Sequence, residues 1–379
     1  MKKVLIVVAG NNGTIGRCSL NLFRAFKERD DVEVKCVGVH RYDNGFEEFA
    51  DCEFFSDYHG NHNSNIREHV KWLREIKNSY KPNLTISTLH SVNVLNCLVF
   101  ANDIRVGIFH SPHKQGRVFG ILRYILYVLP YWFLFKRLDL CSCVSKEVED
   151  DLLSFRGIKR ERIKTIYNIH LVDEILRKAE DDVQDKPDPP YFIYCGRLDA
   201  NKAPIRAVKA LAKSNTKVSL LIVGKGEEPF VSDFKEQVGK LGLSDRVILL
   251  GEKSNPYPYI KGAKALVSSS YSEGLPGVII ESLAIGVPVI STNSSRGIWE
   301  VLSVDDSYDN TLIDVFETKY GIITSNLAAK DSSSEELDIE NLSKGYQMIE
   351  KYQQMPKPEF LEKIKREAIT NQYISLISK

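Results

Sequence analysis

Short hydrophobic runs alternate along the first half of the chain with longer segments whose apolar residues recur on one helical side. The runs predict strands at Val4–Ala9, Val32–Val39, Leu84–Ser87, Arg105–Phe109, Leu138–Val144 and Ile163–Ile166. The segments between them predict helices at Arg17–Glu28, Ile66–Ser79, Val92–Asn102 and Lys146–Ser154. This alternation is typical of a parallel sheet flanked by helices.

A second series of the same kind follows a charged, proline-rich stretch at Asp181–Pro190, which we interpret as a domain linker. Strands are expected at Tyr191–Cys195, Val218–Val223, Val247–Leu250, Ala265–Ser268 and Val289–Ser291. Helices are expected at Ala203–Ser214, Pro229–Leu241 and Tyr257–Lys261, and in the amphipathic tail from Glu336. The prediction is an α/β protein with domains at 1–180 and 191–359. Ligands bind at the carboxyl ends of such strands, so we expect the site in a cleft between the domains.

The most informative stretch is Ser268–Gly286, which carries two carboxylates, Glu273 and Glu281. Pro276 suits the first turn of a helix, and Gly286 suits its end. A strand therefore runs into a polar loop that opens a helix, and the free N–H groups of such a helix form an anion site. The alternative is that Glu273 complements the helix dipole while Glu281 is a solvated helix residue.

Composition narrows the class of protein. The 379 residues suit two domains, and the net charge of +1 gives no argument for a nucleic-acid partner. The seven cysteines lack zinc-ligand spacing and are expected to be reduced. The apolar run that opens the chain is too short for a signal peptide. We therefore expect a cytoplasmic protein.

Two further loops follow predicted strands and contain groups suited to phosphate. Arg197 and Lys202 precede a helix, where a planar guanidinium and an ammonium suit a diphosphate. The alternative, equally consistent with the sequence, is that both are surface cations that contact solvent or Asp199. Gly224 and Gly226 would let a backbone approach a ligand. The loop that contains Glu252 would offer backbone groups to a base, or is an ordinary loop.

Four segments of the second half stand out by their order and spacing: GRLDANK at 196–202, GKGE at 224–227, DRVILLGE at 245–252 and SYSEGLPGVIIESLAIGVPVIST at 270–292. Together they resemble glycosyltransferase family 4, the retaining enzymes of the GT-B fold. The resemblance covers roughly Tyr191 to Leu302, and is looser in the first half. It implies two Rossmann-like α/β domains that face each other across a deep cleft. It also implies that residues 360–379 return to the first domain.

The resemblance implies roles for particular residues. Glu273 would contact the donor sugar, and Glu281 would hold the nucleotide ribose. Arg197 and Lys202 would neutralise the diphosphate, with Gly274, Leu275 and Pro276 holding phosphate at the helix entrance. His110 would lie beside the sugar, with His113 as a competitor for that role and a core histidine as the alternative. No metal and no cofactor would be required, because cations and helix N-termini stabilise the leaving diphosphate.

Two departures from the family pattern concern loops. Ala203 stands where the family usually has glycine, so this loop is expected to differ slightly. The stretch Ser294–Gly297 matches the family only approximately and receives no role.

The glycines at Gly10, Gly13 and Gly16 resemble a dinucleotide-binding fingerprint. The second strand, however, ends in Val39-His40-Arg41 rather than in the acidic residue that would hold a ribose. A dehydrogenase or epimerase is therefore disfavoured. In the glycosyltransferase interpretation, Gly13 would meet the acceptor or the donor phosphate.

The segment Val118–Phe135 is nearly all apolar and lies within a basic region at 114–137. A buried helix, an interfacial helix on an anionic membrane surface and a transmembrane span are three interpretations, of which the last is disfavoured by the internal Arg123 and Pro130. An interfacial helix would fit a peripheral membrane protein with a lipid-linked acceptor.

The expected function is transfer of a hexose or N-acetylhexosamine from a nucleotide-sugar, most simply a UDP-sugar, to a hydroxyl of a glycan or lipid-linked glycan. The alternatives are a sugar-nucleotide epimerase or a glycan phosphorylase on the same architecture. A catalytically silent scaffold is disfavoured because Arg197, Lys202, Glu273 and Glu281 are all present.

Overall fold

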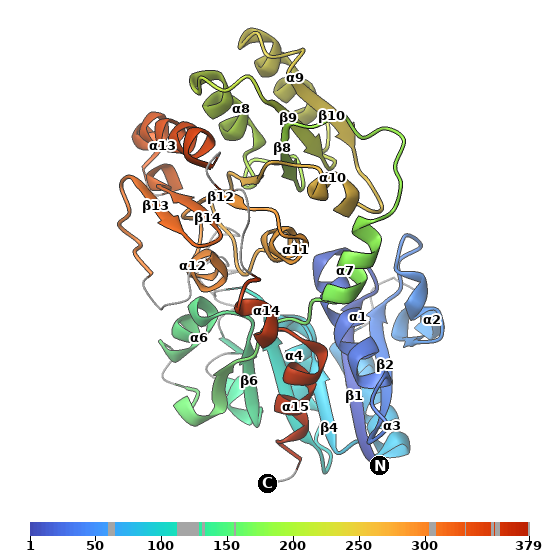
Figure 1. The fold of residues 1–379 in the computed structure, drawn as a ribbon. Helices are drawn as coiled ribbons and strands as arrows, with labels where there is room; N and C mark the ends of the chain where they lie inside the picture. The colour runs from blue at the N-terminus through green and yellow to red at the C-terminus, as the bar shows by residue number, and fades with distance from the viewer. Residues whose placement is uncertain are drawn as a thin grey trace. The chain divides into compact units, whose positions relative to one another are not determined.

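The protein folds into two compact units in a computed structural model (Figure 1). The structure describes residues 1–59, 65–111, 129–130, 133–154, 157–302, 308–329, 331–349, 352 and 357–377. Unit 1 comprises Met1–His170 and Lys363–Lys379, and unit 2 comprises Leu171–Glu362. The chain therefore divides before the predicted linker at 181–190 rather than within it. Helix α7 (Val172–Ala179) packs on unit 2 through buried Ile175 and Ala179, a contact that linker composition does not reveal.

Unit 1 is built on a seven-stranded, wholly parallel sheet in the order β3-β2-β1-β4-β5-β6-β7. Its strands are β1 (Lys2–Gly10), β2 (Val32–His40), β3 (Glu53–Phe54), β4 (Leu84–Ser87), β5 (Ile104–Phe109), β6 (Leu140–Cys143) and β7 (Ile163–Thr165). Its helices are α1 (Gly13–Lys27), α2 (Phe55–His59), α3 (Ile66–Tyr80), α4 (His90–Leu98), α6 (Lys146–Leu153) and α15 (Arg366–Ile374). Residues 4–8 of β1 are all fully buried, because helices cover both faces of a parallel sheet.

Some element boundaries differ from the prediction. The glycine loop expected from Gly10 to Gly16 is reduced to two residues, since β1 ends at Gly10 and α1 begins at Gly13. Helix α4 ends at Leu98, four residues before the expected end. The short β3 and α2 were not predicted, because two strand residues are too few to show a period.

The C-terminal helix α15 belongs to unit 1, as the resemblance implied. It packs on α1 and is also held by polar side chains of unit 1. Tyr373 Oη lies 2.9 Å from Ser142 Oγ, and Arg29 Nη1 donates to Asn371 Oδ1 at 2.7 Å. The preceding short helix α14 (Phe360–Lys363) leads into it.

Unit 2 contains a second seven-stranded sheet in the order β10-β9-β8-β11-β12-β14-β13, with β13 antiparallel. Its strands are β8 (Tyr191–Cys195), β9 (Ser219–Val223), β10 (Val247–Gly251), β11 (Leu266–Ser268), β12 (Val289–Thr292), β13 (Val315–Thr318) and β14 (Gly321–Thr324). Its longer helices are α8 (Pro204–Lys213), α9 (Phe230–Lys240), α10 (Tyr257–Lys261), α11 (Gly277–Ile285), α12 (Arg296–Leu302) and α13 (Glu335–Met348). The hairpin β13–β14 was not predicted, although every residue of β14 is buried.

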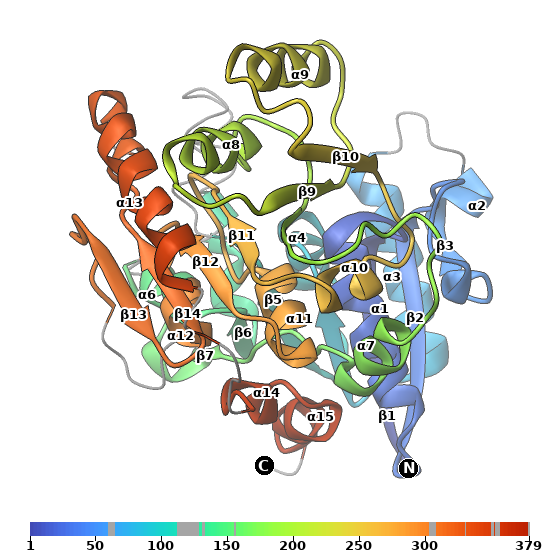
Figure 2. The ribbon, with the colours of Figure 1, turned by 45° about the horizontal axis from the view of Figure 1, so that its top comes forward.

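Helix α13 lies along β12 and β14 and contacts α8, as Figure 2 shows. Tyr346 anchors it, with its ring 4.7 Å from that of Phe192 and its hydroxyl donating to Ala207 O at 3.1 Å. This packing brings the start of α13 close to the start of α8, which adjoins the candidate site.

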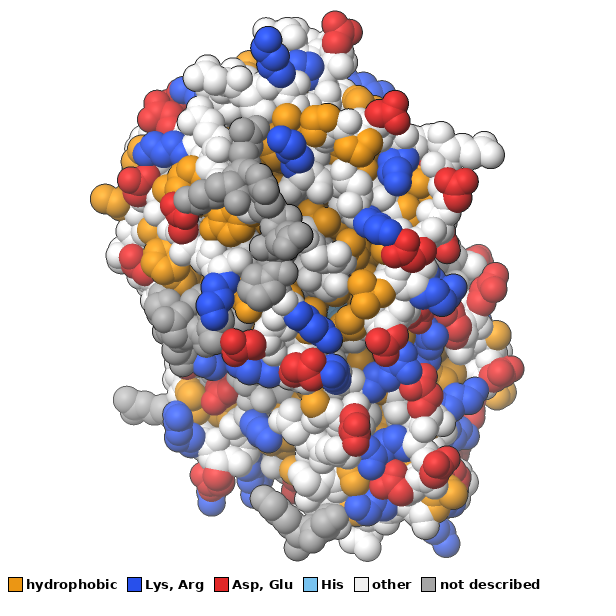
Figure 3. All heavy atoms as spheres, in the orientation of Figure 1, with side chains coloured by type: hydrophobic (Ala, Val, Ile, Leu, Met, Phe, Trp, Pro, Cys, Tyr) orange, Lys and Arg blue, Asp and Glu red, His pale blue; other side chains and the backbone are white. Residues whose placement is uncertain are grey.

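On the face drawn in Figure 3, basic and acidic side chains are interspersed, in keeping with the net charge of +1. Within the described ranges, no helix combines the length and apolar character needed to cross a membrane. Most of Val118–Phe135, together with His113, Lys114 and Arg117, lies outside those ranges. At its described end Phe135 is buried 5.0 Å from the Phe109 ring, whereas 60% of Phe133 is exposed.

Candidate functional site

The predicted loops of unit 2 meet at the carboxyl edge of its sheet, because β8 lies between β9 and β11. The loop after β8 is tied to the loop after β9 by Leu198 N, which donates to Lys225 O at 2.8 Å. It is tied to the loop after β11 by Tyr271 N, which donates to Asn201 O at 2.8 Å. Segments more than seventy positions apart thereby form one polar surface.

Hydrogen bonds from nearby residues fix the conformation of the loop that contains Arg197 and Lys202. Asp199 Oδ1 accepts from Lys202 N at 2.8 Å, and Tyr194 Oη donates to Arg197 O at 2.7 Å. Burial raises the pKa of the Tyr194 hydroxyl well above its ordinary value, so this hydroxyl remains a donor. Ala203 then takes a left-handed conformation, with φ 44° and ψ 53°. Glycine adopts this conformation without strain, which explains the family's preference at this position.

Lys202 and Glu273 are in direct contact, with Lys202 Nζ 2.6 Å from Glu273 Oε1. Ser270 Oγ donates to the same carboxylate oxygen at 2.6 Å, and Glu273 N donates to Ser294 O at 3.2 Å. The side chains of Lys202 and Glu273 are 25% and 11% exposed, so the pair is accessible at the edge of the sheet. By contrast, the Arg197 side chain is 71% exposed and pairs with Asp199 at 3.2 Å. The structure thus brings Lys202 to Glu273 and leaves Arg197 on the surface.

Helix α11 begins one residue later than predicted, with Pro276 as its N-cap rather than in its first turn. No side chain of the described residues caps this end, and the first turn contains no acidic residue. Its opening N–H groups are therefore not engaged by a side-chain cap, as an anion site requires. The helix ends at Gly286 with φ 93°, as predicted, and Val287 N donates to Ser282 O at 2.9 Å.

Glu281 lies on α11 beside the ends of two other elements. Tyr257 Oη, at the start of α10, donates to Glu281 Oε1 at 3.5 Å. Burial, with a smaller contribution from the negative charge of Glu281, raises the pKa of the Cys195 thiol to about 12. Glu281 therefore lies near the end of β8, on the same edge of the sheet as Glu273.

The glycines after β9 are required by contacts within the protein. A Cβ on Gly224, whose φ is 148°, would lie 1.8 Å from Gly196 O, and one on Gly226 would lie 2.4 Å from Leu198 O. Close approach of a ligand to these glycines stays a prediction. Glu252, in the loop after β10, has an exposed side chain that pairs with Lys225 at 2.6 Å.

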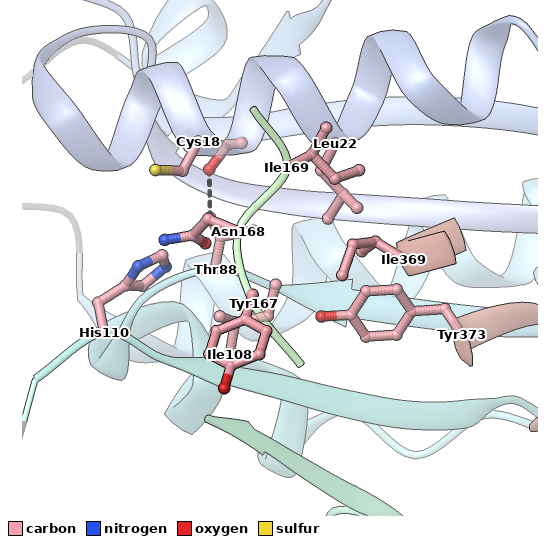
Figure 4. Close-up of a pocket in the computed structure, with 11 residues that line it drawn as sticks. Cys18, Leu22, Thr88, Ile108, His110, Tyr167, Asn168, Ile169, Ile369 and Tyr373 are labelled. Atoms are coloured by element: carbon pink, nitrogen blue, oxygen red, sulfur yellow. Dashed lines mark hydrogen bonds between the residues drawn. The ribbon is translucent and has the colours of Figure 1, made fainter. Parts of the chain in front are cut away.

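His110 follows β5 in unit 1 and lines a small pocket there (Figure 4). Its ring points toward Asn168 and Cys18, while Tyr373 and Ile369 line the other end. Burial lowers the pKa of His110 to about 4, opposed in part by a backbone hydrogen bond with Thr88, so the imidazole is neutral at pH 7. Nε2 of His110 is buried with no hydrogen-bond partner among the described residues. The competing His113 lies outside them.

The glycine loop of unit 1 is covered by the segment that follows β2. A Cβ on Gly10 would lie 2.6 Å from the Tyr42 ring, and Phe46 N donates to Asn11 O at 2.8 Å. Two of the three glycines of the apparent fingerprint thus serve packing, since a Cβ on Gly16 would lie 3.2 Å from Asn11 C. Gly13 differs, because it has φ 69° and no atom of the described residues lies within 4 Å of where a Cβ would be.

The sequence did not indicate the residues that hold the Glu273 loop and the start of α11 in place in unit 2. Ser270, Ser294 and Ser295 are serines in polar loops and are not distinctive by type or spacing. Gly297 is buried, and a Cβ there would lie 2.3 Å from Gly274 O. The approximate match to the family at 294–297 was the feature of the sequence that could have indicated their importance.

The comparisons with known proteins agree with this architecture. Residues 177–315 match the family described as Glycosyl transferases group 1. An uncharacterized glycosyltransferase of Methanocaldococcus jannaschii is 28% identical over 222 residues, which are 56% of this chain and 53% of that protein. A lipopolysaccharide 1,6-galactosyltransferase of Salmonella typhimurium is 27% identical over 60% of this chain and 59% of its own. This chain thus spans little more than half of either relative.

A third relative, of Campylobacter jejuni, is a GalNAc-alpha-(1->4)-GalNAc-alpha-(1->3)-diNAcBac-PP-undecaprenol alpha-1,4-N-acetyl-D-galactosaminyltransferase. It is 26% identical over 76% of this chain and 72% of its own. Among solved structures, the galactosyltransferase WaaB in its apo form aligns over 99% of both chains with a TM-score of 0.67 and 16% identity. Anabaena Alr3699/HepE in complex with UDP-glucose aligns over 100% of both, with a TM-score of 0.66 and 15% identity. The GT-B fold class is thereby confirmed, whereas family 4 stays a prediction.

Proposed function

We propose that this chain, in which residues 177–315 belong to the glycosyl transferases group 1, is a glycosyltransferase that uses a nucleotide-sugar. The donor would be a UDP-linked hexose or N-acetylhexosamine, and the acceptor a hydroxyl of a glycan or lipid-linked glycan. Support comes from the relatives, whose names specify galactosyl and N-acetylgalactosaminyl transfer, and from a structural neighbour in complex with UDP-glucose.

The observation that carries the proposal is the Lys202–Glu273 contact beside the uncapped start of α11. A leaving diphosphate needs positive charge, which the Lys202 ammonium and the α11 N–H groups supply. Gly274, Leu275 and Pro276 lead into this helix and would lie against the phosphates. Arg197 is exposed and free to turn from Asp199 toward a second phosphate.

Glu273 and Glu281 would act on the two ends of the donor. Glu273 accepts hydrogen bonds from Lys202 and Ser270, and would accept one from a sugar hydroxyl. Glu281 would hold the ribose hydroxyls, with the backbone around Gly224, Gly226 and Glu252 near the base. Cations and helix N–H groups replace a metal ion in this proposal.

We extend the proposal to the stereochemistry. Front-face attack would retain the anomeric configuration, with the departing phosphate accepting the proton of the acceptor hydroxyl. Neither glutamate then acts as a nucleophile. In unit 1, the neutral His110 can donate or accept a hydrogen bond through its ring nitrogens, and would contact a sugar hydroxyl. Gly13, at the start of α1, would meet the acceptor or a donor phosphate.

A lipid-linked acceptor would require the protein to reach a membrane. The basic, aromatic segment at 114–137 would contact anionic headgroups on the cytoplasmic face. Flotation with liposomes of anionic lipid tests this contact, and absence of binding would contradict it.

The donor is tested by thermal unfolding in the presence of UDP, GDP, ADP and their sugars. A ligand that binds only the folded state raises the melting temperature, so the correct nucleotide should raise it most. Nucleotide release that depends on a glycan acceptor would then identify a transferase. An epimerase would convert the sugar without release, and a phosphorylase would require free phosphate and no nucleotide.

A further inference from the structure

A fully buried ion pair lies directly behind the candidate site of unit 2. Arg206, in the first turn of α8, is 1% exposed, and Asp338, in the first turn of α13, is 0% exposed. Arg206 Nη2 donates to Asp338 Oδ2 at 2.9 Å. Neither residue is exposed to a ligand, so the proposed chemistry does not use them directly.

Asp338 is fully occupied by hydrogen bonds from its surroundings. Its Oδ1 accepts from Ser325 Oγ at 2.5 Å and from Leu327 N at 2.9 Å, and its Oδ2 accepts from Ala328 N at 2.8 Å as well as from Arg206. A carboxylate that accepts this many hydrogen bonds is held firmly in position. Asp338 therefore fixes the guanidinium of Arg206 against the segment after β14.

The second terminal nitrogen of Arg206, Nη1, contacts the loop that contains Glu273. Its Nη1 donates to Ser269 O at 3.2 Å and to Asn326 Oδ1 at 2.9 Å. Its guanidinium also lies 4.5 Å from the centre of the Tyr271 ring. We call the segment Ser269–Gly274 the site loop.

Three consecutive carbonyls of the site loop each accept a bond from a side chain of a different element. Ser269 O accepts from Arg206, Ser270 O accepts from Thr292 Oγ1 at 2.7 Å, and Tyr271 O accepts from Asn326 Nδ2 at 2.9 Å. Asn326 is itself held by Arg206. Two of the three restraints on the loop backbone thus pass through one guanidinium.

The restrained residues connect directly to the site. Ser270, the central residue of the three, donates to Glu273 Oε1, which also accepts from Lys202. A shift of the Ser269–Tyr271 backbone would move Ser270 and change the position of the Glu273 carboxylate. Displacements of about 1 Å in a supporting shell reduce turnover by up to about 100-fold.

We propose that Arg206, clamped by Asp338, is a positioning residue that sets the site loop and thereby the Glu273 carboxylate against Lys202. This inference deepens the proposed function and, for its effect on turnover, rests on it. A buried ion pair that only stabilises the fold is the simpler alternative. The pair Lys77–Asp103 of unit 1, 2.8 Å apart and fully buried, is an example, because its hydrogen bonds reach Asn96 and Thr85 rather than a candidate site.

The test uses Arg206→Lys in the full-length chain. Lysine keeps a positive charge for Asp338, but one ammonium cannot reproduce the planar fork that binds Ser269 O and Asn326 Oδ1 together. Arg246→Lys is the matched control, because Arg246 Nη2 also donates to two carbonyls of unit 2, Thr216 O at 2.7 Å and Val218 O at 3.0 Å. These two carbonyls lie at the amino end of β9, whereas the site loop follows the carboxyl end of β11.

Two measurements separate positioning from folding. Hydrogen–deuterium exchange of peptides that cover the site loop should become faster in R206K and not in R246K. With the donor identified by thermal shift, kcat should fall about 10- to 100-fold while the donor KM stays within about threefold. The melting-temperature increase produced by the free nucleotide should be retained, because Glu281 is unchanged.

Unchanged exchange in the site loop of folded R206K, or a kcat within about twofold of the parent, would overturn the proposal. If R206K does not fold, Asn326→Ala takes its place, because it removes the bond to Tyr271 O and leaves the ion pair intact. If the parent protein releases no nucleotide from any donor, the proposed function has failed. The exchange measurement then decides the positioning role alone.

Discussion

Replacement of Lys202 by methionine separates the proposed diphosphate role from a structural one. The substitution keeps the length of the side chain and removes the ammonium that lies 2.6 Å from Glu273 Oε1. Glu273 keeps its hydrogen bonds through Ser270 Oγ and its own N–H, so the loop should hold its conformation.

The expected loss of stability is small. Hydrogen bonds to charged groups contribute about 1.5–3 kcal/mol, but exposed ion pairs contribute only about 0–1 kcal/mol. The Lys202 side chain is 25% exposed, so we expect a cost of about 1 kcal/mol. For a unit of this size that lowers the melting temperature by about 2–4 °C.

The expected loss of activity is much larger. Removing one group that stabilises developing charge typically costs about 100- to 1,000-fold in kcat, or about 2.7–4 kcal/mol. We therefore expect K202M to be folded and nearly inactive. The assay is nucleotide release from the donor that gives the largest thermal shift, measured beside thermal unfolding of the same preparations.

Lys240→Met is the matched control. Lys240 pairs with Glu236 at 2.5 Å on α9, where both side chains are more than 60% exposed. K240M should retain parental turnover. A K202M variant whose kcat remains within about threefold of the parent would refute the assignment of Lys202 to the leaving diphosphate.

Three further variants test local features. Gly297→Ala would place a Cβ 2.3 Å from Gly274 O, so we expect a loss of about 1–3 kcal/mol in urea unfolding and slower nucleotide release. Gly239→Ala, whose Cβ would lie 3.9 Å from Ser244 Oγ, should show neither effect. Ala203→Gly should leave stability equal or raise it by up to about 1 kcal/mol, because glycine relieves the left-handed strain but loses more chain entropy; a lower unfolding midpoint would contradict this. The pKa of His110 falls from 6.5 to about 4 on folding, so the unfolded state binds more protons between these values, and stability falls as pH is lowered through this window. His110→Gln should make this pH dependence of the free energy of unfolding shallower in urea unfolding between pH 4 and 7. Identical slopes for the variant and the parent would show that burial of His110 does not cause the dependence.

Much of the fold could be predicted from the sequence, because hydrophobic periodicity is a local property. Residue type and spacing predict the cores of both strand series, the end of α11 at Gly286 and the start of that helix beside Pro276. The hairpin β13–β14 was missed because its four-residue strands are too short for periodicity to distinguish. The assignment of α7 to unit 2 was missed because the burial of a helix depends on the elements that pack against it, here α10 and α11.

The candidate site divides in the same way. The sequence indicated Lys202, Glu273 and Glu281 by type and motif, but not that Lys202 contacts Glu273 while Arg197 stays on the surface. That outcome depends on β8 and β11 being neighbours in the sheet although β9 and β10 lie between them in the chain. Arg206 and Asp338 are 132 positions apart, and nothing local marks either as a partner. The sequence by itself determined which segments form strands and helices, because their patterns repeat over a few residues. Only the tertiary structure decided which polar groups meet, because strand order brings distant loops to one edge of a sheet and buried groups must find partners there.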